Sequence, residues 1–147
     1  MLPAGWWAVA DVSRAALDTS VLVRHLTGDD PARAARASRL LARAAAGEVE
    51  LVVPPVVLAE LAWVLESVFH LPRAEAADLL DAVLATPGLS VPERPILAQA
   101  VAAYRDHGVD FADAWIAASA GTHGCARVYT FDRRRFARLR GVRAEAP

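Results

Sequence analysis

The chain has 147 residues, a hydrophobic content of 55% and a formal net charge of -1. This length suits one domain with a buried core, and the near-neutral charge excludes a protein that coats nucleic acid without selectivity. All 16 basic residues are arginine, which excludes a Gly-Lys phosphate loop and Schiff-base catalysis. The single cysteine, Cys125, excludes an internal disulfide and a multi-cysteine metal site.

The chain also lacks the signals of a membrane or secreted protein. Charged residues interrupt every apolar stretch before it reaches the length of a membrane helix. The first residues contain Trp6 and Trp7 but no basic region and no cleavage site. We therefore expect a cytoplasmic protein without membrane contact, made of an N-terminal extension (1–13) and one folded domain (14–147).

Short apolar runs alternate with longer helical patterns along the chain, which predicts an α/β fold. Pro54-Pro55 and Pro87-Gly88 are typical of the breaks between such elements. In chain order the patterns predict a strand at 14–18, helices at 19–27 and 32–46, a strand at 50–53, helices at 56–69 and 73–85, a strand at 89–91, helices at 96–107 and 111–120, a strand at 127–131, a helix at 133–139 and a last strand near Val142.

Four acidic residues lie in or directly after apolar segments: Asp18, Glu60, Asp113 and Asp132. Asp18 and Asp132 follow predicted strands, and ligands bind at the carboxyl edge of a parallel sheet. Converging carboxylates raise one another's pKa, so such a cluster is stable mainly around a cation. The sequence therefore predicts a site for Mg²⁺ or Mn²⁺, which prefer oxygen ligands and could activate a water for attack on a phosphodiester.

Each acid also has a simpler interpretation that the sequence leaves open. Asp18, Asp110 and Asp132 each precede a predicted helix and could be N-caps, and Glu60 could be a solvated residue at the edge of an amphipathic helix. The arginines from Arg133 to Arg135 could form a solvated helix face or contact phosphate groups.

Four segments containing these acids resemble, in order, the motifs of the PIN-domain ribonucleases, specifically the VapC-type toxins of bacterial toxin–antitoxin pairs. The segments are Leu-Asp-Thr-Ser-Val-Leu-Val-Arg-His-Leu-Thr-Gly-Asp-Asp-Pro at 17–31, Val-Leu-Ala-Glu-Leu at 57–61, Asp-Phe-Ala-Asp-Ala-Trp-Ile-Ala-Ala at 110–118 and Thr-Phe-Asp at 130–132. The resemblance extends from Ala15 to Val142, and the extension before it departs from the family pattern.

The resemblance implies a three-layer α/β/α fold with a central parallel sheet of four to five strands. It implies that the four acids are catalytic and metal-binding in an Mg²⁺- or Mn²⁺-dependent endoribonuclease. It further implies a homodimer that forms a hetero-oligomer with a small VapB-like antitoxin. The supporting residues would be Ser20, Thr130 and Asp110, and the candidate RNA contacts are Arg24, Arg133 and Arg134.

Other function classes fit the sequence less well. An aspartate-nucleophile phosphatase needs Asp-x-Asp, but Ser20 occupies the second position, and a receiver domain needs a lysine that the chain lacks. An inactive PIN-like module that binds RNA or protein is the remaining alternative, although such a module would be expected to have lost some of the four acids.

Overall fold

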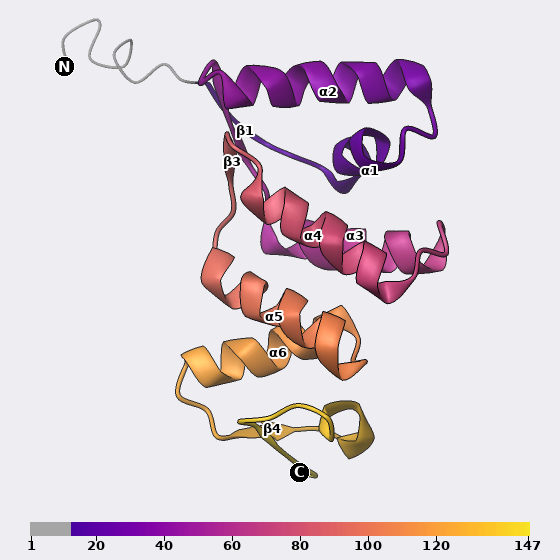
Figure 1. The fold of residues 1–147 in the computed structure, drawn as a ribbon. Helices are drawn as coiled ribbons and strands as arrows, with labels where there is room; N and C mark the ends of the chain where they lie inside the picture. The colour runs from indigo at the N-terminus through magenta and orange to yellow at the C-terminus, as the bar shows by residue number, and fades with distance from the viewer. Residues whose placement is uncertain (1–12) are drawn as a thin grey trace, which may run out of the picture.

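The computed structural model describes residues 13–147 and forms an α/β fold with parallel strands (Figure 1). Residues 1–12 of the predicted extension (1–13), with Trp6 and Trp7, lie outside the described residues, whereas Ser13 is already the first residue of β1. The elements are β1 (Ser13–Ala16), α1 (Thr19–Thr27), α2 (Pro31–Ala45), β2 (Val49–Val52), α3 (Pro55–Ser67), α4 (Arg73–Ala85), β3 (Leu89–Ser90), α5 (Arg94–His107), α6 (Phe111–Thr122), β4 (Arg127–Tyr129), the 3-10 helix η2 (Arg133–Phe136) and β5 (Arg143–Glu145). Among these residues no helix is long and apolar enough to cross a membrane.

The strands form two separate parallel sheets. The main sheet has the order β1-β2-β3, with Ala15 opposite Leu51 and Leu51 opposite Leu89. The second sheet pairs β4 with β5 and places Val128 opposite Ala144. The expected α/β class with parallel strands is confirmed, but the main sheet contains three strands where four to five were expected.

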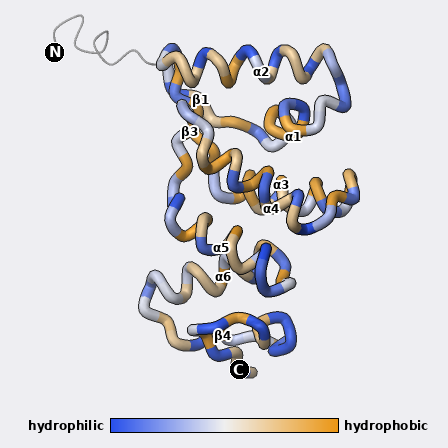
Figure 2. The backbone as a smooth tube through the Cα atoms, in the orientation of Figure 1, coloured by the Kyte–Doolittle hydropathy of each residue, from blue (hydrophilic) through white to orange (hydrophobic). Residues whose placement is uncertain are grey.

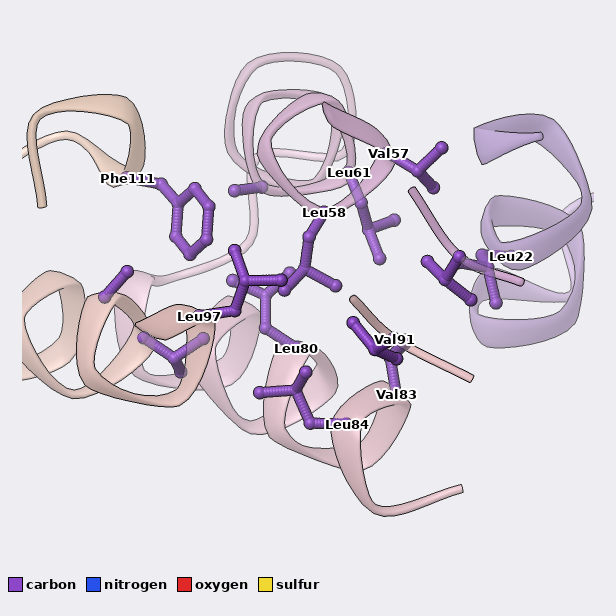
Figure 3. Close-up of a cluster of buried hydrophobic side chains, with 14 of the residues drawn as sticks. Leu22, Val57, Leu58, Leu61, Leu80, Val83, Leu84, Val91, Leu97 and Phe111 are labelled. Carbon is purple, nitrogen blue, oxygen red and sulfur yellow. The ribbon is translucent and has the colours of Figure 1, made fainter. Parts of the chain in front are cut away.

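The hydrophobic core lies between the main sheet and the helices that follow it. Leu58, Leu61, Leu80 and Leu97 are fully buried and come from α3, α4 and α5 (Figure 3). Hydrophobic stretches gather in α1 and α3, whereas hydrophilic residues dominate around β4 (Figure 2). Apolar burial therefore holds α3 at the centre, because burying one Leu side chain contributes about 1.5 to 3 kcal/mol.

Helix α3 lies between α1 and α6. It packs against both helices, while α1 also packs on α2 and α6 packs on α5. In Figure 3, Leu22 of α1 and Phe111 of α6 lie on opposite sides of the side chains of Leu58 and Leu61. Functional residues at the start of α1 and at the start of α6 are therefore separated by a layer of core.

The predicted helices are found at nearly the predicted positions, and the differences occur at the ends of elements. The first strand ends at Ala16, before Asp18, because the Asp18 side chain already caps α1 by accepting a hydrogen bond from the backbone N–H of Ser20. The predicted helix at 133–139 is only a short 3-10 turn, and the last strand begins at Arg143, one residue after Val142.

A close contact fixes α2 against the start of β3. Gly88 has a φ of +84°, and a Cβ added there would overlap the backbone carbonyl group of Ala44. Gly47 has a similar φ of +81°, but a Cβ added at Gly47 would meet nothing within 4 Å. A substitution at Gly47 therefore tests backbone strain alone, whereas the same substitution at Gly88 tests backbone strain together with a steric clash.

We expect Gly88→Ala to lower the free energy of unfolding by about 2 to 4 kcal/mol, because both strain and overlap with rigid backbone act there. The matched control Gly47→Ala should cost only about 1 to 2 kcal/mol, from strain alone. Urea denaturation of both variants checks this, and equal losses would show that α2 moves away from β3 freely.

Candidate functional site

Asp18 and Ser20 form a hydrogen-bonded pair at the start of α1. The Asp18 carboxylate accepts hydrogen bonds from the backbone N–H of Ser20 at 3.1 Å and from its hydroxyl at 2.6 Å. These bonds favour the charged form and hold the pKa of Asp18 below its ordinary value. An exposed, ionised carboxylate is thus fixed in orientation two residues beyond β1.

Glu60 of α3 is joined to the same helix start. The Thr19 hydroxyl donates to Glu60 Oε2 at 2.9 Å, and Thr19 itself is buried. This bond links α1 to α3 and places Glu60 beside the residue that follows Asp18. We call Asp18 and Glu60, with Thr19 and Ser20, the α1–α3 half-site.

We expect Ser20→Ala to raise the pKa of Asp18, because both the hydroxyl donor and the capped turn geometry hold the charged form. The pKa is depressed in the folded state, so its stabilising contribution is present above the unfolded-state pKa and disappears as the pH falls through the folded value. A carboxyl NMR titration of both proteins checks the shift. An unchanged Asp18 titration would show that the hydroxyl does not interact with it in solution.

Asp113 lies in the first turn of α6 and is buried, with an exposed fraction of 2%. Arg135 of η2 holds both carboxylate oxygens: Nε donates to Oδ2 at 3.0 Å, and a terminal guanidinium nitrogen donates to Oδ1. A bidentate arginine pair of this kind is among the strongest polar contacts in proteins. It fixes η2 against α6.

Two further acids lie around the same arginine. The pKa of Arg135 is raised chiefly by its hydrogen bond and charge interaction with Asp113, and further by the charges of Asp132 and Asp110. Asp110 occupies the N-cap position of α6 but makes no side-chain capping bond, and Asp132 is exposed. We call Asp110, Asp113, Asp132 and Arg135 the α6–η2 half-site.

Thr130 supports the end of this segment. Its hydroxyl accepts a hydrogen bond from the backbone N–H of Asp132 at 3.0 Å, and its own N–H donates to the Glu145 carbonyl of β5. Thr130 therefore shapes the turn between β4 and η2.

The structure does not bring the four predicted acids into one pocket. Within residues 13–147 no three acidic, histidine or cysteine side chains are grouped so that they could hold a metal ion. The α1–α3 half-site contains only two of the acids, Asp18 and Glu60. In the α6–η2 half-site, Arg135 already binds both carboxylate oxygens of Asp113. In this arrangement of a single chain the residues do not fit the expected divalent cation.

The predicted RNA contacts differ in their surroundings. Arg24 forms an ion pair with Asp29 at 2.5 Å and lines a pocket of about 450 Å³ that also includes Ser20, Arg33 and Arg36. Arg133 and Arg134 are exposed, and no ion pair to either is found in the described part of the chain. All three guanidinium groups therefore lie at the surface, although that of Arg24 is partly covered.

Two residues that hold the acids are not singled out by any pattern in the sequence. Arg135 belongs to a basic run, and Thr19 is a position inside the first motif. They lie 22 and 41 residues from their partners Asp113 and Glu60, so no local signal connects them. The only hint in the sequence is that each lies close to a motif acid, Asp132 or Asp18.

The family comparison matches the PIN domain over residues 15–142, nearly the whole chain. The chain belongs to the PIN domain family. PIN domains are generally nucleases, and both half-sites fall inside the matched region. No curated protein matches the chain.

Proposed function

We propose that this PIN domain is a metal-dependent endoribonuclease and the toxin of a VapC-type toxin–antitoxin pair. The observation that carries the proposal is that each half-site contains acids at positions of the PIN motifs. In each half-site a specific partner residue orients an acid through hydrogen bonds. Ser20 orients Asp18, Thr19 orients Glu60, and Arg135 fixes Asp113. Orientation of this kind is what a reaction centre requires of its carboxylates.

The residues of the chain have separable tasks in this proposal. The hydrogen bonds from Ser20 keep Asp18 ionised. The hydrogen bond from Thr19 positions Glu60, which would supply a second negative charge near Asp18. Asp113 and Asp132 would complete the negative pocket once the half-sites meet. A bound Mg²⁺ or Mn²⁺ would supply an activated water and neutralise phosphodiester charge.

The surface around the α1–α3 half-site supports an RNA substrate. Ser20 lines the same pocket as Arg24, Arg33 and Arg36. Cationic groups therefore lie next to the proposed reaction centre. Guanidinium groups bind phosphate oxygens in a planar, bidentate geometry. The backbone of a single strand could therefore be bound in this pocket while one phosphodiester lies near Asp18.

The Arg135–Asp113 pair supports the antitoxin part of the proposal. It demonstrates that this carboxylate accepts a guanidinium with both oxygens. We propose that a small VapB-like protein inhibits the enzyme by placing a basic side chain, preferably arginine, against the acidic residues. If the chain alone is harmless when expressed in its host, the toxin assignment fails even if the nuclease assignment stands.

The separation of the half-sites favours one alternative, a PIN-like module that binds RNA or protein without cleaving it. An assay of cleavage and binding on the same single-stranded RNA separates the two functions. We expect cleavage with Mg²⁺ or Mn²⁺ and complete loss in excess EDTA, because the carboxylates need a cation to converge. Cleavage that survives EDTA would contradict metal dependence, and tight binding without cleavage would favour the module.

A further inference from the structure

The main sheet has an open edge at β1. Its four residues are all exposed, and within the described chain β1 pairs only with β2. Strands of parallel sheets are normally buried, since helices or further strands cover them. An open edge of this kind presents a row of free N–H and C=O groups to another strand.

The second sheet has a matching open edge at β4. Two strands are too few for a stable independent sheet, and β4 pairs only with β5 among the described residues. Next to it, Tyr129 and Phe131 are 62% and 92% exposed, and Ile116 of α6 is 45% exposed. Helix α6 and β4 therefore present apolar surface that a partner would cover.

The β4 strand of the same chain does not reach β1 in this structure. In Figure 1, β1 lies beside α1 and α2, whereas β4 lies at the opposite end beyond α5 and α6. Phe111 and Ala114 of α6 are 4% and 1% exposed in the core against α5 and α3. Closing the two edges within one chain would require α6 to leave this packing.

We propose that two copies of the chain exchange these edges, so that β1 of each copy pairs in parallel with β4 of the other. Each copy has one open β1 edge and one open β4 edge. A two-fold dimer therefore pairs all of these edges and leaves no β1 or β4 edge open to bind a third copy. The result is a five-stranded parallel sheet in the order β3-β2-β1-β4-β5, with the last two strands supplied by the second copy.

The hydrogen-bond pattern limits the registers that this pairing can adopt. The N–H of Leu17 donates to β2 and that of Thr130 donates to β5, so alternation leaves the backbone groups of Ala16 and Tyr129 facing the open sides. In a parallel ladder Tyr129 then lies opposite Ala15 or Leu17, and of these two registers we take the one with Ala15. The same offset places Asp132 level with Asp18, which brings the α1–α3 half-site of one copy to the α6–η2 half-site of the other.

A cysteine crosslink tests the exchange without relying on any activity. In a Cys125→Ser background, Ala15→Cys and Tyr129→Cys place thiols on directly opposed residues, within the reach of a disulfide. Mild oxidation should give a covalent dimer of the 15.7 kDa chain, and light scattering should give the dimer mass before oxidation. Arg14→Cys with Tyr129→Cys, which places the first thiol on the other face, should crosslink far less.

An internally linked monomer would overturn the proposal in favour of closure within one chain. A protein that is monomeric and does not crosslink would also overturn it.

A second test rests on the proposed function and asks whether the site is shared. Asp18→Asn and Asp132→Asn proteins are each expected to lose about 10-fold or more in rate, Asp18→Asn the more of the two, but their co-refolded mixture forms mixed dimers in which one of two sites has all four acids. Activity should recover to about a quarter of the wild-type rate. No recovery between proteins that do crosslink as dimers would overturn the shared site. If the wild-type protein cleaves no RNA, the proposed function fails, and the crosslink still decides the exchange.

Discussion

Asp113→Asn and Asp18→Asn should each slow RNA cleavage by about 100-fold or more, since each removes a negative charge from a fixed position in the proposed metal site. Asp18 is oriented by Ser20, whereas the buried Asp113 would have to exchange its Arg135 contacts for the cation, and each then supplies one negative charge. Asp110 makes no capping bond and is exposed. Asp110→Asn should therefore cost less than about 10-fold, because asparagine is an equally good N-cap residue.

Turnover of one single-stranded RNA substrate, measured with melting temperatures to confirm folding, checks this order. Asp132→Asn should fall between the two groups, because Asp132 is exposed and its segment is positioned through Thr130. An inactive Asp110→Asn beside an active Asp113→Asn would mean that the wrong carboxylate of α6 has been assigned to the reaction.

Arg135→Ala should lower the free energy of unfolding by about 1 to 3 kcal/mol, because it leaves the buried Asp113 carboxylate without its bidentate partner. The melting temperature should fall by about 3 to 10 °C for a chain of this length. The reverse change, Asp113→Asn, should cost less. Its unpaired partner Arg135 has a side chain that is 49% exposed and can be solvated.

Arg134→Ala is the matched control for this prediction. Arg134 lies on the same 3-10 helix and is exposed, so its removal should change the free energy of unfolding by no more than about 0.5 kcal/mol. Thermal and urea denaturation of the three variants give the comparison. Equal stability of Arg135→Ala and Arg134→Ala would show that the Asp113 pair contributes nothing to the fold.

Local patterns in the amino-acid sequence are enough to locate the elements of this protein. Apolar periodicity predicts the helices from α1 to α6, and the breaks at Pro54-Pro55 and Pro87-Gly88 separate them. The positions of Asp18 after the first strand and of Asp113 in the first turn of a helix likewise follow from neighbouring residues. Parallel strands follow from the alternation of short apolar runs with helices.

How these elements meet depends on tertiary packing. The packing of α6 on α5 separates β4 from β1 and divides the predicted acidic pocket into two half-sites. The partners of Glu60 and Asp113 also come from distant segments, through Thr19 and Arg135. Such contacts depend on the burial of whole helix faces and on which sheet edges remain open. Both depend on many residues far apart in the chain, so no local sequence pattern predicts them.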